Sequence, residues 1–103
     1  MPWEDYNLQI MRAKELEKLY KVLGNRRRMR IVKLLLKKGK MTVSDISDDI
    51  DLSFRATSRH LIQLFHVDVL RKEQLNKNVF YEISGSLNQT IKSLISHIHH
   101  SGE

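Results

Sequence analysis

The fold of this chain of 103 residues is decided by one stretch, Leu52-Ser53-Phe54-Arg55-Ala56-Thr57-Ser58-Arg59-His60-Leu61-Ile62-Gln63-Leu64-Phe65. Ser53 is a good N-cap, because its hydroxyl can accept a hydrogen bond from a free N–H of the first helical turn. The residues that follow it recur at helical spacing and are apolar or half apolar: Phe54, Thr57, Leu61, Leu64 and Phe65. We therefore expect a helix that buries one stripe.

The opposite side of this helix carries a different chemistry. Its positions i, i+3, i+4 and i+7 are Arg55, Ser58, Arg59 and Ile62. A guanidinium group can fork onto a guanine edge or bind a phosphate, a serine can bond either, and a small apolar side chain suits a thymine methyl group. This side favours a helix that lies in the major groove of duplex DNA.

The segments on either side complete a recognisable arrangement. Residues 42–50 predict a short helix that keeps Val43, Ile46 and Ile50 on one face, and two helices joined by about three residues form a helix-turn-helix. Residues 69–74 and 79–83 are rich in β-branched and aromatic side chains and predict a hairpin. A helix-turn-helix followed by a hairpin is a winged helix.

The turn of the hairpin sets which residues face each other. A turn at Asn76 and Lys77 would place Arg71 opposite Glu82 and leave Lys77 at the tip, where it can reach phosphates.

The chain resembles the ArsR/SmtB-type winged-helix transcriptional regulators over roughly residues 16 to 84. The resemblance is carried, in order, by Leu23 to Ile31, by Leu52-Ser53, by Ser58-Arg59-His60-Leu61 with Leu64, and by Val79 to Ile83. It implies one mainly α domain with a small β-hairpin over residues 1–103, built of five helices and a two-stranded antiparallel wing. It also implies a dimer that binds duplex DNA.

Three positions depart from the family pattern. Asp51 and Asp68 stand where the family usually has glycine, and aspartate tolerates a left-handed backbone better than most residues. Ile62 stands where the family often has a polar residue, which weakens the case for a base contact there.

A dimer interface is expected from the first helix (3–23) and the last (about 86–100). The first helix has more apolar residues than one packing stripe needs, and the last carries a clean stripe with little else to cover. The alternative is that the first helix packs more deeply in its own core. The expected interface consists of Tyr6, Ile10, Ala13, Leu87, Ile91, Leu94, Ile95 and Ile98. A two-fold pair would place the recognition helices about 34 Å apart and predicts an inverted-repeat operator.

Four arginines crowd the start of the second expected helix, which Asn25 caps: Arg26, Arg27, Arg28 and Arg30. Cations are poorly placed at a helix N-terminus, so an anion should lie nearby. The anion is either a DNA phosphate or an acidic side chain: Glu15, Glu17 or the patch Asp45, Asp48, Asp49 and Asp51. Arg28 favours a structural role, because it matches a family position that usually packs. His60 is given no chemical role.

No cofactor is expected. Related metal sensors hold a metal with an Asp and a His near the start of the last helix and two His near its end. Here only His97 and His100 fit, since Ser84 and Ser86 occupy the other two positions. The chain has no cysteine, which excludes thiolate metal sites and disulfides. His97 and His100 thus remain weak candidates, and no metal site is assigned.

The leading interpretation is a homodimeric, sequence-specific DNA-binding regulator, most simply a repressor. The expected DNA contacts are Ser53, Arg55, Thr57, Ser58, Arg59, Ile62, Gln63 and Lys77. A protein-interaction module and a metal-responsive repressor with a C-terminal histidine site are the alternatives. The sequence identifies no effector.

An enzyme is not expected, because there is no cysteine nucleophile, no Gly-rich phosphate loop and no histidine–carboxylate constellation. The net charge of +6 favours polyanionic partners. Neither a signal peptide nor a membrane span is visible, so we expect a cytoplasmic protein without a membrane partner.

Overall fold

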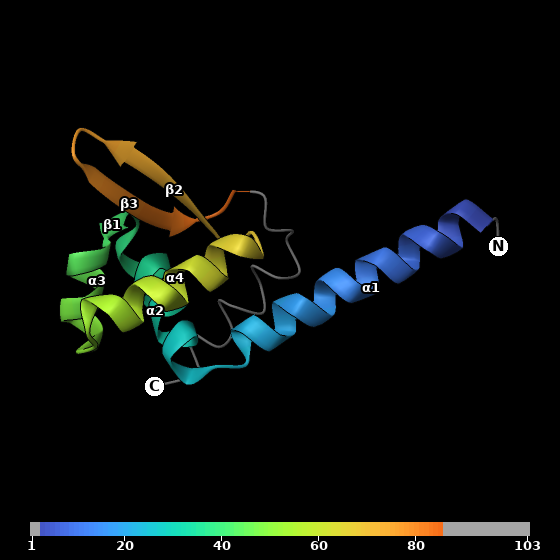
Figure 1. Ribbon diagram of the computed structural model, residues 1–103, viewed down its shortest axis with the longest axis horizontal. Helices are drawn as coiled ribbons and strands as arrows, with labels where there is room; N and C mark the ends of the chain where they lie inside the picture. The colour runs from blue at the N-terminus through green and yellow to red at the C-terminus, as the bar shows by residue number, and fades with distance from the viewer. Residues whose placement is uncertain (1–2, 86–103) are drawn as a thin grey trace.

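The computed structural model describes residues 3–85, with side chains described from residue 12 onward. Within this part the elements are α1 (Trp3–Leu23), α2 (Arg26–Lys38), β1 (Met41–Thr42), α3 (Val43–Ile50), α4 (Phe54–His66), β2 (Leu70–Leu75) and β3 (Asn78–Ile83). Figure 1 shows α1 extending away from the body that the other elements form, with the hairpin β2–β3 above α3 and α4. The fold is a winged helix-turn-helix.

The core gathers around α2, the second helix. Its side chains Ile31, Val32 and Leu35 are buried and meet the buried stripes of the helices that follow. The other apolar residues of this core are Leu19, Met41, Ile46, Ile50, Leu61, Leu64, Val69, Leu70 and Tyr81. Both helices of the helix-turn-helix and the base of the wing are thus held by one apolar cluster.

The helix starts are set by local capping. Asn25 Oδ1 accepts a hydrogen bond from the N–H of Arg28 at 3.0 Å, and Ser53 Oγ accepts one from Ala56 at 3.1 Å. Each bond satisfies an N–H that has no partner within its own helix. The predicted caps of the second helix and of the recognition helix are therefore confirmed.

Within residues 3–85, three residues other than glycine adopt the left-handed backbone conformation. They are Asp51 (φ 54°), Asp68 (φ 61°) and Asn76 (φ 58°). Asp and Asn accept this conformation at lower cost than most residues. Asp51 lies in the corner of the helix-turn-helix, so the fold keeps its corner without the glycine that the family pattern has there.

The sheet has three strands, and the predicted two-stranded wing was wrong in this respect. The order is β1-β3-β2 and both pairings are antiparallel, with Met41 opposite Tyr81. The two residues of β1 are too short to show an alternating pattern. They pair along the free edge of β3 and tie the wing to the end of α2.

The hairpin itself has the predicted register. Arg71 faces Glu82, and Leu75 faces Asn78 across a two-residue turn made by Asn76 and Lys77. The left-handed Asn76 suits such a turn.

Four helices lie in the described part of the chain, against five in the prediction. The predicted last helix, about 86–100, lies outside residues 3–85, and so do its expected interface residues and His97 and His100. The side chains of Tyr6 and Ile10 are likewise not among those described.

Candidate nucleic-acid interface

The recognition helix α4 buries one stripe and exposes the other. Leu61 and Leu64 are fully buried against the core. On the outer side Arg55 and Arg59 are exposed, Ile62 is 44 % exposed and Ser58 is half-buried. The predicted outward set is thus brought together on one side of one rigid helix, with two guanidinium groups on its N-terminal half.

Phe54 does not lie where the sequence placed it. It was expected in the buried stripe, but 58 % of it is exposed. Phe54 is the first residue of α4, ahead of the turn that packs against α2 and α3, so the core does not reach it. The helical period alone does not reveal where along a helix the packing begins.

Thr57 is a second correction, because the structure buries a residue that was expected to contact DNA. It is 0 % exposed, and its Oγ1 has no hydrogen-bond partner among the described residues. It occupies the inner stripe beside Leu61, as its spacing from Leu61 and Leu64 requires. A side chain in this position cannot reach a nucleic acid.

Arg28 joins three helices. Its Nε donates to the backbone oxygen of Val22 at 2.5 Å, and its Nη2 donates to that of Lys21 at 3.4 Å. Its Nη1 donates to Gln63 Oε1 and lies 3.4 Å from His60 Nδ1. The structural interpretation of Arg28 is confirmed, and the contact with α4 is one that the sequence did not indicate.

The other arginines of α2 are not paired with the acidic side chains that were considered for them. Arg26, Arg27 and Arg30 are exposed, and no ion pair is recorded for them within residues 12–85. Instead, Glu17 pairs with Lys21 at 3.1 Å and Asp49 with Lys38 at 2.9 Å. Three guanidinium groups thus remain available to an external anion.

His60 lies half-buried beside the guanidinium of Arg28. Burial lowers the pKa of His60 below its ordinary 6.5, and the positive charges of Arg28 and Arg27 lower it further. Both causes disfavour the imidazolium form. His60 is therefore neutral at physiological pH.

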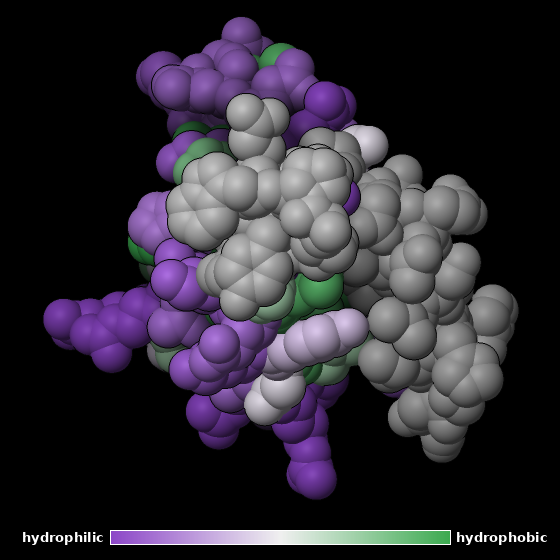
Figure 2. Space-filling view, turned by 90° about the vertical axis from the view of Figure 1, so that its right-hand side faces the viewer, coloured by the Kyte–Doolittle hydropathy of each residue, from purple (hydrophilic) through white to green (hydrophobic). Residues whose placement is uncertain are grey.

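The wing lies beside α4 and presents polar side chains. Lys72 Nζ of β2 lies 4.7 Å from the centre of the Phe65 ring of α4, within the range of a cation–π contact. Lys77 is exposed in the turn at the tip. Figure 2 shows hydrophilic side chains gathered at the top of the molecule, over the wing.

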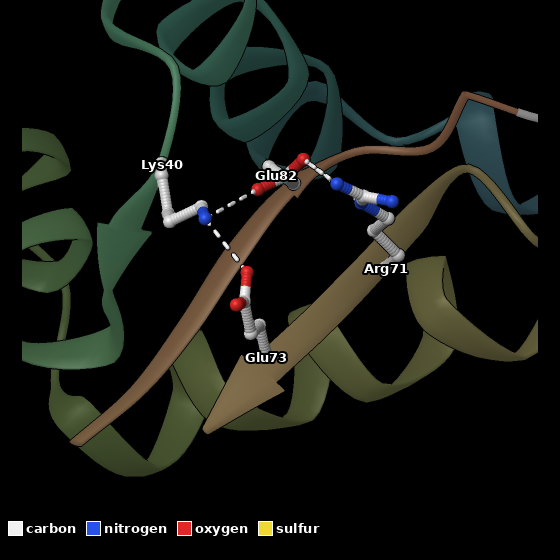
Figure 3. Close-up of polar contacts among 4 residues, drawn as sticks. All are labelled: Lys40, Arg71, Glu73 and Glu82. Atoms are coloured by element: carbon white, nitrogen blue, oxygen red, sulfur yellow. Dashed lines mark hydrogen bonds and ion pairs between the residues drawn. The ribbon is translucent and has the colours of Figure 1, made fainter. Parts of the chain in front are cut away.

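A group of four charges joins the wing to the turn after α2. Lys40 Nζ lies 2.7 Å from Glu73 Oε2 and 3.3 Å from Glu82 Oε2, while Arg71 Nη2 lies 2.7 Å from Glu82 Oε1. Figure 3 shows Glu82 between the two cations, with Glu73 reaching Lys40 from below, from the strand that also carries Arg71. Two cations and two carboxylates balance, so this group of four residues carries no net charge.

These contacts shift the titration of their members. The hydrogen bond from Arg71, helped by the one from Lys40, lowers the pKa of Glu82 below 4.5. The hydrogen bonds to Glu73 and Glu82 raise the pKa of Lys40 above 10.5.

The acidic patch is a solvated surface. Asp45, Asp48, Asp49 and Asp51 are all exposed, on α3 and at its C-terminal end. Their charges would repel phosphates, so this surface does not belong to the candidate interface.

Neither a membrane-spanning helix nor a metal cluster occurs in the described part of the chain. No helix there is long and apolar enough to span a membrane. Among residues 12–85, whose side chains are described, no group of three or more His, Asp or Glu is placed to hold a metal ion.

Residues 25–72 match the family model described as bacterial regulatory protein, arsR family. This range contains α2, the helix-turn-helix and the start of β2. No curated protein matched the chain in sequence.

Solved structures share the fold. Reduced HlyU from Vibrio cholerae N16961 is 26% identical, with a TM-score of 0.75 over 89% of this chain and 93% of that one. The homodimeric winged helix-turn-helix DNA-binding domain Mb0332 from Mycobacterium bovis is 19% identical, with a TM-score of 0.78 over 91% and 83%. The transcriptional repressor PagR of Bacillus anthracis is 22% identical, with a TM-score of 0.75 over 86% and 98%. The last two likenesses show the fold alone.

The family match and the fold agree with each other. The matched residues form the helix-turn-helix, and the hairpin that follows provides its wing. Proteins of this family regulate transcription and are not enzymes, which confirms the expectation of a non-enzymatic protein. Residues 25–72 thus carry the helix-turn-helix of the ArsR family model, in a chain with the winged helix-turn-helix fold that transcriptional regulators share.

Proposed function

We propose that the chain is a homodimeric repressor that binds an inverted-repeat operator through α4 and the wing. The observation that carries this proposal is the outer side of α4. Arg55 and Arg59 are exposed there, while the opposite side of the same helix is sealed in the core. A rigid helix that presents guanidinium groups near its N-terminal end is suited to the major groove.

The contacts divide into two kinds. Arg55, Ser58 and Arg59 read base edges, and Ile62 supplies an apolar contact to a thymine methyl group. The remaining contacts bind the sugar–phosphate backbone of the DNA and fix the register of the protein on the duplex. Ser53 remains in this second group, because its oxygen accepts the capping bond while its hydroxyl hydrogen can be donated to a phosphate. Lys77 binds a phosphate from the tip of the wing, and Thr57 is left out.

The second copy of the chain binds along α1. From residue 12 to residue 18 every side chain of this helix is exposed, including Ala13 and Leu16, and Tyr20 is 58 % exposed. A helix with this little packing of its own is marginal in water, so a partner would stabilise it. The interface joins Tyr6, Ile10 and Ala13 with Leu87, Ile91, Leu94, Ile95 and Ile98, and the similar domain Mb0332 is homodimeric.

Repression follows most simply from occlusion of a promoter in the cytoplasm. A dimer with two recognition helices about one DNA turn apart covers an inverted repeat and excludes other proteins from it. The structurally similar PagR is a transcriptional repressor. No effector is proposed.

Selection of bound fragments from a random duplex library tests this function. We expect enrichment of an inverted repeat, and affinity that falls steeply as salt increases because phosphate contacts release counterions. Enrichment of single half-sites of the repeat would contradict the proposal that the chain binds DNA as a dimer. Absence of salt-dependent DNA binding, with binding to a protein instead, would favour an interaction module anchored by the exposed Phe54 and Ile62.

A further inference from the structure

The chemistry of Arg28 fixes the orientation of the side chain that it holds on α4. A guanidinium group has five N–H donors and no acceptor. The atom of Gln63 that faces Arg28 Nη1 must therefore be the amide oxygen, Oε1. For the same reason, His60 faces Arg28 with an unprotonated Nδ1, which agrees with its lowered pKa.

The outer half of Gln63 is then a pure donor. With Oε1 turned inward to Arg28, the amide NH₂ group points away from it. Gln63 is exposed, and no hydrogen bond from its Nε2 is recorded within the described part of the chain. Gln63 follows Arg59 by one helical turn, so both lie along the same side of α4.

We propose that Arg28 is a positioning residue for Gln63. By holding Oε1 of Gln63, it leaves only the amide NH₂ group, a hydrogen-bond donor, to face the DNA. This inference rests on the proposed function and adds the polarity of one contact. A free glutamine forks onto adenine, giving one hydrogen bond to N7 and accepting one from N6. With Oε1 occupied, Gln63 instead selects an acceptor, which is either a phosphate oxygen or the N7 of a purine.

Substitution of Gln63 tests this polarity. Gln63→Glu keeps an acceptor for Arg28 but turns a second acceptor toward the DNA, whereas Gln63→Met removes hydrogen bonding altogether. We expect Gln63→Met to weaken operator binding about threefold to tenfold, and Gln63→Glu to weaken it about tenfold more. Retained or improved binding by Gln63→Glu would show that Gln63 accepts from a DNA donor, which overturns the proposal.

The action of Arg28 through Gln63 is tested by a double-mutant cycle. Lysine at position 28 keeps the charge but cannot bond Val22, Lys21 and Gln63 together. We expect Arg28→Lys to weaken operator binding several-fold in the wild-type protein and hardly at all in the Gln63→Met protein. A purely structural role would give the same loss in both backgrounds.

Arg27→Lys is the matched control, because Arg27 is the exposed neighbour on α2 and makes no recorded hydrogen bond to α4. Its effect should be the same with and without Gln63→Met.

Modified duplexes identify the acceptor. Methylphosphonate at single positions weakens a phosphate acceptor, and 7-deazaguanine or 7-deazaadenine removes a purine N7. One such change should weaken binding of the wild-type protein but not of Gln63→Met. If every change weakens both proteins equally, Gln63 does not touch DNA and the inference fails while the proposed function stands. If the wild-type protein does not bind DNA, both fail.

Discussion

Arg71 and Glu82 face each other across the wing and are joined by two contacts to one oxygen. Arg71 Nε and Nη2 lie 2.8 Å and 2.7 Å from Glu82 Oε1. Because Lys40 holds the other oxygen at 3.3 Å, a single carboxylate joins β3 to β2 and to the turn before β1. Protonation of this carboxylate would weaken both contacts.

Acid should weaken the contacts of Glu82 with Arg71 and Lys40. The folded pKa of Glu82 lies below 4.5, so the carboxylate stabilises the fold above pH 4.5 and this stabilisation is lost as the pH falls through the lower folded value. We expect the ¹³C resonance of the Glu82 carboxyl to titrate with a midpoint below pH 4.5. In Arg71→Met this midpoint should move toward pH 4.5. Lys72→Met, on the other side of the strand, should leave it unchanged. An unchanged midpoint in Arg71→Met would contradict the conclusion that the hydrogen bond from Arg71 lowers the pKa of Glu82.

His60 should make stability fall on mild acidification. Its pKa is lowered in the fold, so the unfolded chain takes up a proton first as the pH falls through 6.5. We expect the thermal midpoint to fall between about pH 7.5 and 5, with a smaller fall in His60→Gln, which cannot take up that proton. The wild-type protein and His60→Gln share all other histidines, so the difference between them reports on His60 alone. Equal falls in the two proteins would exclude His60 as the source.

Thr57→Val should stabilise the protein. The buried Oγ1 has no hydrogen-bond partner among the described residues, and valine fills the same space without a polar atom. We expect the free energy of unfolding to rise by about 1 kcal/mol, with operator affinity unchanged. Thr42→Val is the control, because Thr42 Oγ1 caps α3 at 3.2 Å and its loss should destabilise by about 1 kcal/mol. A loss of operator affinity in Thr57→Val would restore Thr57 to the interface.

Ala13→Glu should separate the proposed dimer. Ala13 is exposed in the single chain, so glutamate there costs the isolated fold little. In the dimer it would bury a charge between apolar side chains. We expect a monomer by analytical ultracentrifugation and an operator affinity about a hundredfold lower, because a monomer holds one half-site. Lys14→Gln, at the next and also exposed position, lowers the net charge by the same one unit and tests whether charge alone is responsible.

The parts of the fold that depend on local chemistry could be predicted from the sequence. Asn25 and Ser53 start their helices because their side chains satisfy N–H groups three residues on. The two-residue turn sets Arg71 opposite Glu82, because a short turn fixes the register of a hairpin.

The parts that depend on distant packing could not be predicted. β1 has two residues and pairs with a strand far along the chain, so no period reveals it. Arg28 and Gln63 are 35 positions apart, and nothing in either local pattern indicates their contact. The exposure of Phe54 depends on which turns of α4 pack against α2 and α3.

The most direct test of the account compares Arg59→Ala with Lys77→Ala on the selected operator and on a scrambled duplex, by fluorescence anisotropy over a range of salt concentrations. Arg59→Ala should cost ~1–3 kcal/mol on the operator and little on the scrambled duplex, because a base contact is lost. Lys77→Ala should weaken both duplexes about equally and reduce the salt slope by about one. Equal losses from the two substitutions on both duplexes would contradict the claim that the outer side of α4 reads DNA sequence.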